Sequence, residues 1–326
     1  MRHPCSHQEG SPSGHFAREC RKECGTGYCH MNEQSEENLW YRSTLSCRKR
    51  IVVKIGSSSL LHTNTGRMNF EMIDRLARVL SNLKNEGRDV ILVSSGATAV
   101  GREVIQHAAE MPEHDSPITV KQALASVGQA RLMMIYQKCF DDYNEIVSQV
   151  LMTKNTVLNH LSRYNIRNTF QELLKFGVIP IVNENDSVAT YEYSVGDNDN
   201  LSAMVASLVH ADLLILLSDI DGLYTDDPRT SSAAKFIDYV PHMNEAILKM
   251  GKGSTGSSCG TGGMSTKLSA ARIATASGCD MAILNAAEIG GIRRLIAGEN
   301  VGTLFRAEPD DRFDLEEYIE EMDYSG

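Results

Sequence analysis

Short apolar runs alternate with longer amphipathic stretches between residues 50 and 284. The apolar runs predict strands, and the stretches with apolar residues three or four positions apart predict helices. Alternation of this kind is typical of a parallel sheet that is covered on both faces. The predicted fold is therefore α/β, with a doubly wound, mainly parallel sheet and helices on both faces. We expect strands at 50–55, 90–93, 146–152, 178–182, 213–217 and 281–284, and helices at 70–83, 120–138, 164–176, 201–209 and 264–277.

The ends of the chain lack this pattern, which divides the sequence into three parts. Residues 1–48 contain few aliphatic residues and five of the eight cysteines, and we expect them to be a disordered extension. Their cysteines and histidines raise the alternative of a zinc site, but the spacing matches no standard pair of ligands. A chain that started at Met31 would lack most of this segment. Residues 49–308 form the predicted globular domain, and residues 309–326 form an acidic tail, either solvated or a short amphipathic helix.

The formal net charge of −10 is concentrated in the acidic tail. Residues 310–326 carry eight acidic side chains and one arginine, so the rest of the chain is nearly neutral. Such a body lacks the basic face of a nucleic-acid-binding protein, and no apolar run reaches the length that a membrane span needs. Widely spaced cysteines in the globular part fit a reducing compartment. We expect a cytoplasmic protein that binds neither nucleic acids nor membranes.

Polar residues and glycines gather after the predicted strands, where ligands bind to parallel sheets. Lys54 lies near the end of the first strand and precedes a turn of small residues at 56–59, which suits a phosphate group close to backbone N–H groups. The turn is not a Walker A loop, and a lysine at the end of a strand is often simply solvated. Small residues at 94–97 would let a substrate lie against the backbone, although a tight turn explains them equally well.

Two loops, 183–186 and 195–200, are dense in Asp, Asn and Glu residues. One such residue is enough to cap a helix, so this density indicates a binding site. Carboxylates and amides there would hold the ammonium and carboxylate groups of an amino acid and would also orient lysines.

A glycine-rich segment at 260–267 leads directly into a predicted helix. Free N–H groups and the positive end of the helix dipole attract an anion, and Lys267 adds a full charge in the first turn. The alternative is a flexible loop with a helix cap. Residues 218–224, after an apolar strand, would suit contacts with a nucleotide. Together, two lysines, two glycine-containing turns and an Asx-rich pocket indicate phosphoryl transfer to a small polar acceptor.

Six segments resemble the glutamate 5-kinase branch of the amino acid kinase family. The likeness extends from about residue 50 to residue 306, and the Asx-rich pair of loops and the glycine-rich segment are its most specific parts. The segments are VKIGSSSLL, VSSGATAVGRE, VNENDSVAT, VGDNDNLSA, LLSDIDGLYTDDPR and GTGGMSTKLSAA.

The resemblance implies a role for each matching position. Lys54 and Lys267 correspond to lysines that contact the phosphates, and Asp199 corresponds to the aspartate that organises both lysines. The implied glutamate-binding residues are Ser95, Asp186 and Asn198. The implied ATP-binding residues are Lys54, Gly56, Ser218, Asp219, Thr261, Gly262, Gly263, Met264, Ser265, Thr266 and Lys267.

The resemblance implies ATP-dependent phosphorylation of the γ-carboxylate of L-glutamate to L-glutamyl 5-phosphate, the first step of proline biosynthesis. A free glutamate side chain has a pKa of about 4.3, so the nucleophile is an anion at pH 7 and needs no general base. Mg²⁺ is expected to bind through the nucleotide phosphates, without a metal site of the protein itself.

Several partners are also expected. We expect a homo-oligomer and a functional coupling to glutamate-5-semialdehyde dehydrogenase, because an acyl phosphate is labile and must be used quickly. Proline shares the α-carboxylate and a cationic nitrogen with glutamate, so feedback inhibition by proline is expected at the same pocket.

Two other functions stay open. Another amino acid kinase, such as acetylglutamate kinase or uridylate kinase, would share the fold, but its acceptor loops should differ from those of this chain. A catalytically silent amino-acid sensor would be indicated by loss of Lys54, Asp199 or Lys267, and all three residues are present. Many bacterial members of the branch carry a C-terminal PUA domain, and we expect none in this chain.

Overall fold

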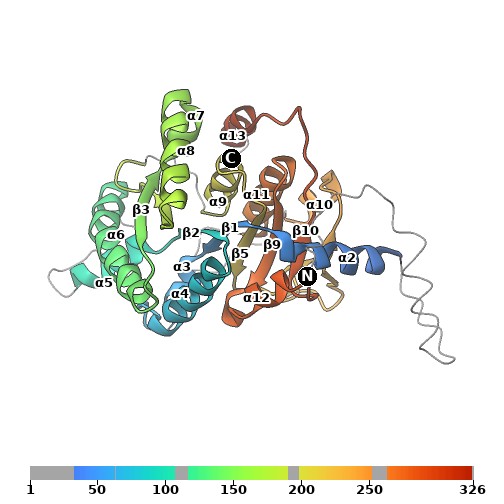
Figure 1. Ribbon diagram of the computed structural model, residues 1–326, viewed down its shortest axis with the longest axis horizontal. Helices are drawn as coiled ribbons and strands as arrows, with labels where there is room; N and C mark the ends of the chain where they lie inside the picture. The colour runs from blue at the N-terminus through green and yellow to red at the C-terminus, as the bar shows by residue number, and fades with distance from the viewer. Residues whose placement is uncertain (1–32, 63, 107–116, 190–197, 252–262, 325–326) are drawn as a thin grey trace.

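The computed structural model describes residues 33–324 other than 63, 107–116, 190–197 and 252–262 (Figure 1). Within these ranges, eight strands form one sheet in the order β3-β4-β2-β1-β5-β9-β10-β8. All neighbouring pairs are parallel except β9 and β10. The strands are β1 (Arg50–Ile55), β2 (Asp89–Ser94), β3 (Val147–Met152), β4 (Ile179–Glu184), β5 (Leu213–Ser218), β8 (Tyr239–Val240), β9 (Asp280–Asn285) and β10 (Thr303–Phe305), and a separate hairpin joins β6 (Leu223–Tyr224) and β7 (Phe236–Ile237).

Helices cover both faces of the sheet (Figure 1). In the view of the figure, α8, α9, α11 and α13 lie above the sheet, and α4 and α12 lie below it. No helix in the described ranges is long and apolar enough to cross a membrane. The helices are α2 (Glu33–Ser43), α3 (Ser57–Leu60), α4 (Phe70–Asn85), α5 (Ala97–Gln106), α6 (Ile118–Asp141), α7 (Lys154–Leu158), α8 (His160–Lys175), α9 (Asn198–Leu208), α10 (Glu245–Lys249), α11 (Met264–Ala276), α12 (Gly291–Ile296) and α13 (Leu315–Tyr324), with 3-10 turns η2 (Thr44–Cys47) and η3 (Ala286–Glu288).

Strand β1 lies at the centre of the sheet and separates its two hydrophobic clusters. Ile51, Val53 and Ile55 face the cluster that includes residues of α4, α6 and α12. Val52 faces the other cluster, which includes residues of α8, α9 and α11. Because side chains alternate along a strand, Lys54 lies on the same face as Val52. The pattern of β1 therefore directs one lysine toward α9 and α11.

The predicted fold class is confirmed. Each of the six predicted strands has its counterpart in β1, β2, β3, β4, β5 or β9, and each of the five predicted helices has its counterpart in α4, α6, α8, α9 or α11. Gly87 and Gly278 follow α4 and α11 with φ of 87° and 83°, a left-handed conformation that favours glycine at the end of a helix. The strands β8 and β10 were not predicted, because two or three residues are too few for a periodic pattern.

The structure differs from the predicted disorder over residues 33–48, where it has α2 and η2. Arg42 of α2 is fully buried, and its guanidinium donates to the carbonyls of Asp238 at 2.7 Å, Val301 at 3.0 Å and Gly302 at 3.1 Å. The same side chain donates to Asn38 Oδ1 at 2.8 Å and to the Glu299 carbonyl at 3.3 Å, and these five hydrogen bonds can replace the apolar contacts that the segment lacks. Residues 1–32, with the histidines and cysteines considered for zinc, lie outside the described residues.

The acidic tail contains a helix, as one of the two alternatives for it predicted. Ile319 of α13 is buried in the cluster that also includes residues of α8, α9 and α11. Glu316 pairs with Arg163 of α8, and the Tyr318 hydroxyl lies 3.3 Å from the Ser269 hydroxyl of α11. One apolar side thus docks the helix, while Glu317 and Glu320 are exposed.

Helices α5 and α6 approach each other unusually closely through two glycines. A Cβ atom on Gly128 of α6 would lie 1.8 Å from the Ala97 carbonyl oxygen, and one on Gly101 of α5 would lie 1.8 Å from the Leu124 carbonyl oxygen. Neither position can accept a side chain without separating the helices. Since α5 follows directly after β2, this contact fixes α6 relative to the carboxyl end of that strand.

Candidate active site

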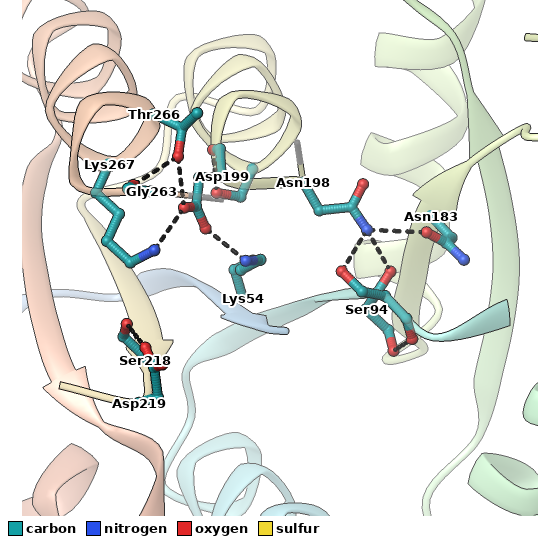
Figure 2. Close-up of polar contacts among 12 residues, drawn as sticks. Lys54, Ser94, Asn183, Asn198, Asp199, Ser218, Asp219, Gly263, Thr266 and Lys267 are labelled. Carbon is teal, nitrogen blue, oxygen red and sulfur yellow. Dashed lines mark hydrogen bonds and ion pairs between the residues drawn. The ribbon is translucent and has the colours of Figure 1, made fainter. Parts of the chain in front are cut away.

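The site lies around the first two residues of α9, whose side chains point in different directions (Figure 2). Asn198 points toward the ends of β2 and β4, whereas Asp199 points toward the end of β1 and the start of α11. Both side chains are buried, Asp199 completely. Adjacent positions on a helix differ by about 100° in direction, so one helix start can serve two neighbouring subsites.

Asp199 contacts one lysine with each carboxylate oxygen. Its Oδ1 lies 2.5 Å from Lys54 Nζ, and its Oδ2 lies 3.0 Å from Lys267 Nζ. The side chains of these lysines are only 7% and 8% exposed, so water screens their charges weakly. Two cations around one anion leave an excess positive charge in this buried place. The structure therefore brings together the three residues that the sequence analysis predicted to be catalytic.

Helix α11 supports the same carboxylate through its first turn. Thr266 Oγ1 lies 2.8 Å from the Gly263 carbonyl oxygen and 3.3 Å from Asp199 Oδ2. Gly263 is the N-cap residue of this helix, and Met264 and Ser265 are its first residues. Thr261 and Gly262, also predicted to bind ATP, lie outside the described residues.

The remaining predicted nucleotide residues lie at the ends of the two central strands. Ser218 ends β5, and its hydroxyl donates to Asp219 Oδ1 at 3.2 Å. Gly56 follows β1, and a Cβ atom there would lie 3.6 Å from Lys54 Nζ. In the parallel sheet, β2 lies on one side of β1 and β5 on the other, so the strand order changes direction at β1. Ligands bind to such sheets at the carboxyl ends of the strands beside this change of direction.

Asn198 anchors the second group of polar residues with its amide nitrogen. Its Nδ2 lies 2.7 Å from Ser95 Oγ, 2.9 Å from the Ser94 carbonyl oxygen and 3.0 Å from Asn183 Oδ1. These acceptors orient the amide, so that its oxygen points away from all three (Figure 2). Of the predicted glutamate-binding residues, the structure thus brings Ser95 and Asn198 into direct contact.

Asp186, the third predicted glutamate-binding residue, lies in the turn after β4. Its carboxyl has no contact with Asn198 or Ser95 among the hydrogen bonds of the described residues. Burial raises the pKa of the Asp186 carboxyl above its ordinary value. A partly desolvated carboxylate is suited to a cationic ligand, because an ammonium group would offset the cost of its burial.

Several residues of the site were not predicted individually. Asn183 accepts from Asn198 and from the Glu184 N–H at 2.9 Å, and Tyr136 shares a 2.8 Å hydrogen bond with the Ser94 hydroxyl. Asn183 belongs to the segment 183–186 that was predicted to be a loop, but it lies in β4. Gln129 and Tyr136 lie on α6, and nothing in their local pattern distinguishes them from other polar residues of a helix.

No group of three or more His, Cys, Asp or Glu side chains in the described ranges is arranged to hold a metal ion. The donors that do converge are two ammonium groups and one carboxylate, a set that suits an anionic ligand better than a bare cation. Binding of Mg²⁺ through the nucleotide phosphates stays a prediction.

Comparison with known proteins identifies the class. Residues 49–285 match the amino acid kinase family, and the chain belongs to that family.

Its curated relatives place it within one branch. A glutamate 5-kinase from Carboxydothermus hydrogenoformans is 49% identical over 264 residues, which cover 81% of this chain and 69% of that protein. A glutamate 5-kinase from Clostridium perfringens is 45% identical over 270 residues, which cover 82% of this chain and 98% of that protein. A third, from Clostridium acetobutylicum, is 47% identical and covers 80% of this chain and 96% of that protein. The predicted resemblance to the glutamate 5-kinase branch is confirmed.

Solved structures agree on the fold. A UMP kinase from Bacillus anthracis aligns with a TM-score of 0.55 and 17% identity, covering 80% of this chain and 97% of that chain. A UMP kinase from Ureaplasma parvum aligns with a TM-score of 0.56 and 14% identity, covering 79% and 99%. At this identity the likeness concerns the architecture alone.

Proposed function

We propose that the protein transfers the γ-phosphoryl group of ATP to the γ-carboxylate of L-glutamate and forms L-glutamyl 5-phosphate, the first step of proline biosynthesis. The observation that carries this proposal is the start of α9, where Asp199 and Asn198 face two groups of residues (Figure 2). One group is cationic and suits phosphates. The other is built of amides and hydroxyls and suits a small zwitterion.

The cationic group supports phosphoryl transfer by neutralising charge. The attacking carboxylate and the nucleotide phosphates are both anionic, so the main obstacle is their repulsion. Lys54 of β1 and Lys267 of α11 both contact the Asp199 carboxylate, which holds the two ammonium groups in position in the absence of substrate. Preorganised cations of this kind stabilise the charge that spreads over the transferring group. Mg²⁺ carried by the nucleotide would supply further positive charge at the phosphates.

The amide and hydroxyl group supports recognition of the amino acid. The Oδ1 atom of Asn198 points away from the three acceptors of the amide nitrogen, so it can accept a hydrogen bond from an ammonium group. The Ser95 hydroxyl can donate to a carboxylate when Asn198 occupies its lone pair. Asp186 adds an anionic group, consistent with a ligand that carries a positive α-nitrogen.

The direct test combines ATP, Mg²⁺, L-glutamate and hydroxylamine. The acyl phosphate reacts with hydroxylamine, so γ-glutamyl hydroxamate should accumulate in proportion to ADP. L-Aspartate and N-acetyl-L-glutamate serve as controls, since the first is one methylene shorter and the second lacks the ammonium group. ADP release without hydroxamate, or equal rates with N-acetylglutamate, would disprove the proposal.

The sensor alternative is disfavoured because Lys54, Asp199 and Lys267 are not only present but in contact. Inhibition by proline, a homo-oligomeric state, a cytoplasmic location and use of the product by glutamate-5-semialdehyde dehydrogenase remain predictions. Proline inhibition follows if the pocket around Asn198 recognises the α-carboxylate and α-nitrogen. In that case proline raises the half-saturating glutamate concentration and leaves the rate at saturating glutamate unchanged.

A further inference from the structure

Four side-chain amides form a continuous row from the candidate amino-acid pocket to the edge of the sheet. Asn198 Nδ2 donates to Asn183 Oδ1 at 3.0 Å, Asn183 Nδ2 donates to Gln129 Oε1 at 2.9 Å, and Gln129 Nε2 donates to Gln149 Oε1 at 3.1 Å. We call Asn198, Asn183, Gln129 and Gln149 the amide row. All three hydrogen bonds run in the same direction, from the pocket outward.

The direction of the amide row has a physical consequence. An amide donates only from nitrogen and accepts only at oxygen, so reversing one amide sets two donors or two acceptors against each other. Asn198, Asn183 and Gln129 are 8%, 2% and 7% exposed, and water cannot easily replace a lost partner there. Hydrogen bonds in such a chain also polarise one another. The orientation of each amide therefore depends on the next one outward.

Both ends of the amide row are defined. At the inner end, Ser95 and Ser94 also accept from Asn198, and Glu184 N–H also donates to Asn183. At the outer end, Gln149 is an exposed residue of β3, the edge strand of the sheet. The pocket is thus connected by hydrogen bonds to a residue on the surface.

The middle of the amide row is held by the glycine contact between α5 and α6. Gln129 follows Gly128, whose backbone lies against Ala97 and Gly101 of α5. Because α5 begins two residues after Ser95, this contact sets the distance from Gln129 to the pocket. A glutamine on a less closely packed helix would not reach Asn183 and Gln149 at once.

We propose that Gln129 and Gln149 are positioning residues for the amino-acid substrate, acting through Asn183 on the amide of Asn198. The inference rests on the proposed function for the identity of the substrate, L-glutamate. Gln129 and Gln149 set the outward direction of the row, so that the oxygen of Asn198 and the free side of the Ser95 hydroxyl face the ligand. The nucleotide side, on the other face of the α9 start, is independent of them.

Kinetics of two variants test the proposal. Gln129→Met keeps the length of the side chain and removes both hydrogen bonds, and it should raise the glutamate KM about five- to tenfold. Gln149→Met removes only the outermost acceptor and should raise the glutamate KM about two- to fourfold. In both variants the ATP KM and kcat should stay within about twofold of wild type, because the lost interaction is made equally in the ground and transition states.

Two further variants separate positioning from a general structural effect. Gln149→Glu keeps an acceptor for Gln129 Nε2 and should restore the glutamate KM to within about twofold of wild type. Gln137→Met makes the same change at an exposed glutamine of α6 outside the amide row, whose amide lies 3.4 Å from Asp141 Oδ1, and should change no kinetic constant. An unchanged glutamate KM in Gln129→Met, or a parallel loss of kcat, ATP affinity and thermal stability, would overturn the proposal.

A spectroscopic measurement keeps this test separate from that of the proposed function. In protein labelled with ¹⁵N-asparagine, Gln149→Met should shift the side-chain NH₂ signals of Asn183, and Gln149→Glu should leave them in place. If wild-type protein makes no γ-glutamyl hydroxamate, the proposed function is wrong. The NH₂ signals of Asn183 then test by themselves whether Gln149 orients the amide row. If the protein is active and neither the signals nor the glutamate KM respond, the amide row has no positioning role.

Discussion

Lys54 and Lys267 contact different oxygens of the same carboxylate, although one belongs to β1 and the other to α11. The carboxylate of Asp199 thereby fixes the separation of two cations that would otherwise repel each other. Both lysines are buried, and the two ion pairs are short. Each of the three residues should consequently affect catalysis through the others.

Replacement of either lysine should reduce turnover far more than substrate binding. Lys54→Ala and Lys267→Ala should each lower kcat by about 10²-fold or more, because both charges act on the phosphoryl group in the transition state. The glutamate KM should change by less than about fivefold. Steady-state kinetics with glutamate and ATP varied in turn measure both effects, and a variant with nearly normal kcat would remove that lysine from the proposed mechanism.

Asp199→Asn should act through the lysines, and its effect should not add to theirs. The amide keeps the size of the side chain but cannot pair with two ammonium groups, so kcat should fall about 10²-fold. The double variant Asp199→Asn with Lys267→Ala should be only slightly slower than the worse single variant. Multiplication of the two single effects in the double variant would mean that Asp199 does not position Lys267.

Asp186→Asn should weaken glutamate binding and stabilise the free protein. Burial raises the pKa of this carboxyl, so the folded protein is favoured by protonation and loses that advantage as the pH rises through the raised pKa. At pH 7 the variant avoids the buried charge and should have a higher Tm, whereas the difference should vanish below about pH 4, where the carboxyl is protonated in both states.

The same variant should raise the glutamate KM at pH 7 with little change in kcat. Melting curves between pH 3.5 and 8, together with glutamate kinetics, measure the two effects separately. Ser187→Ala, an exposed neighbour in the same turn, provides the control. A lower Tm at pH 7, or a low kcat with a normal KM, would contradict a binding role for Asp186.

Removal of the first 30 residues should leave the enzyme intact, and removal of the first 48 should not. A chain that starts at Met31 retains α2, whereas a chain that starts at Lys49 exposes the carbonyls of Asp238, Val301 and Gly302 that accept from Arg42. Loss of these charged hydrogen bonds should cost about 3 kcal/mol or more. Urea unfolding of both chains measures the difference.

The point variant Arg42→Met isolates the contribution of the guanidinium within α2. It should destabilise the full chain nearly as much as removal of residues 1–48, whereas Trp40→Ala, at a position 47% exposed, should have little effect. Equal stability of all four proteins would mean that α2 contributes nothing to the folded domain.

Gly128→Ala should destabilise the protein and raise the glutamate KM together. A methyl group at this position would lie 1.8 Å from the Ala97 carbonyl oxygen, so α6 must move away from α5 at a cost of about 3 kcal/mol. The same movement carries Gln129 away from Asn183. Gly290→Ala, where a Cβ atom would meet nothing within 4 Å, is the matched control for both measurements.

The sequence allowed the fold to be predicted where periodicity was strong. Long apolar strands such as β5 and amphipathic helices such as α4 are recognisable locally, and the ends of parallel strands then gather the loops that follow them. This reasoning, with the family resemblance, is sufficient to group Lys54, Asp199 and Lys267. It could not locate Gln129, whose role depends on a close helix contact between Gly128 and Gly101 rather than on its own surroundings.

The segment before β1 shows a second limit of local patterns. Composition predicted disorder there because aliphatic residues are few. Arg42 instead orders the helix through hydrogen bonds to carbonyls that lie more than 190 positions away in the chain. The Asp280 carboxylate also accepts hydrogen bonds from the Tyr41 hydroxyl at 2.7 Å and from the Arg48 guanidinium at 2.8 Å. Partners so distant in sequence leave no periodic signal near the helix itself.

Helix α13 contacts both α11 and α8. Tyr318 contacts Ser269 and stacks under Arg272 on α11, the helix that carries Lys267, while Glu316 holds Arg163 on α8. Glu320 also offsets the burial that lowers the pKa of Lys154, at the start of α7 beyond the end of β3. A movement of α11 away from α8 would therefore break the contacts of α13 with one of these helices. The position of α11, which carries Lys267, is thereby coupled to the packing of α13.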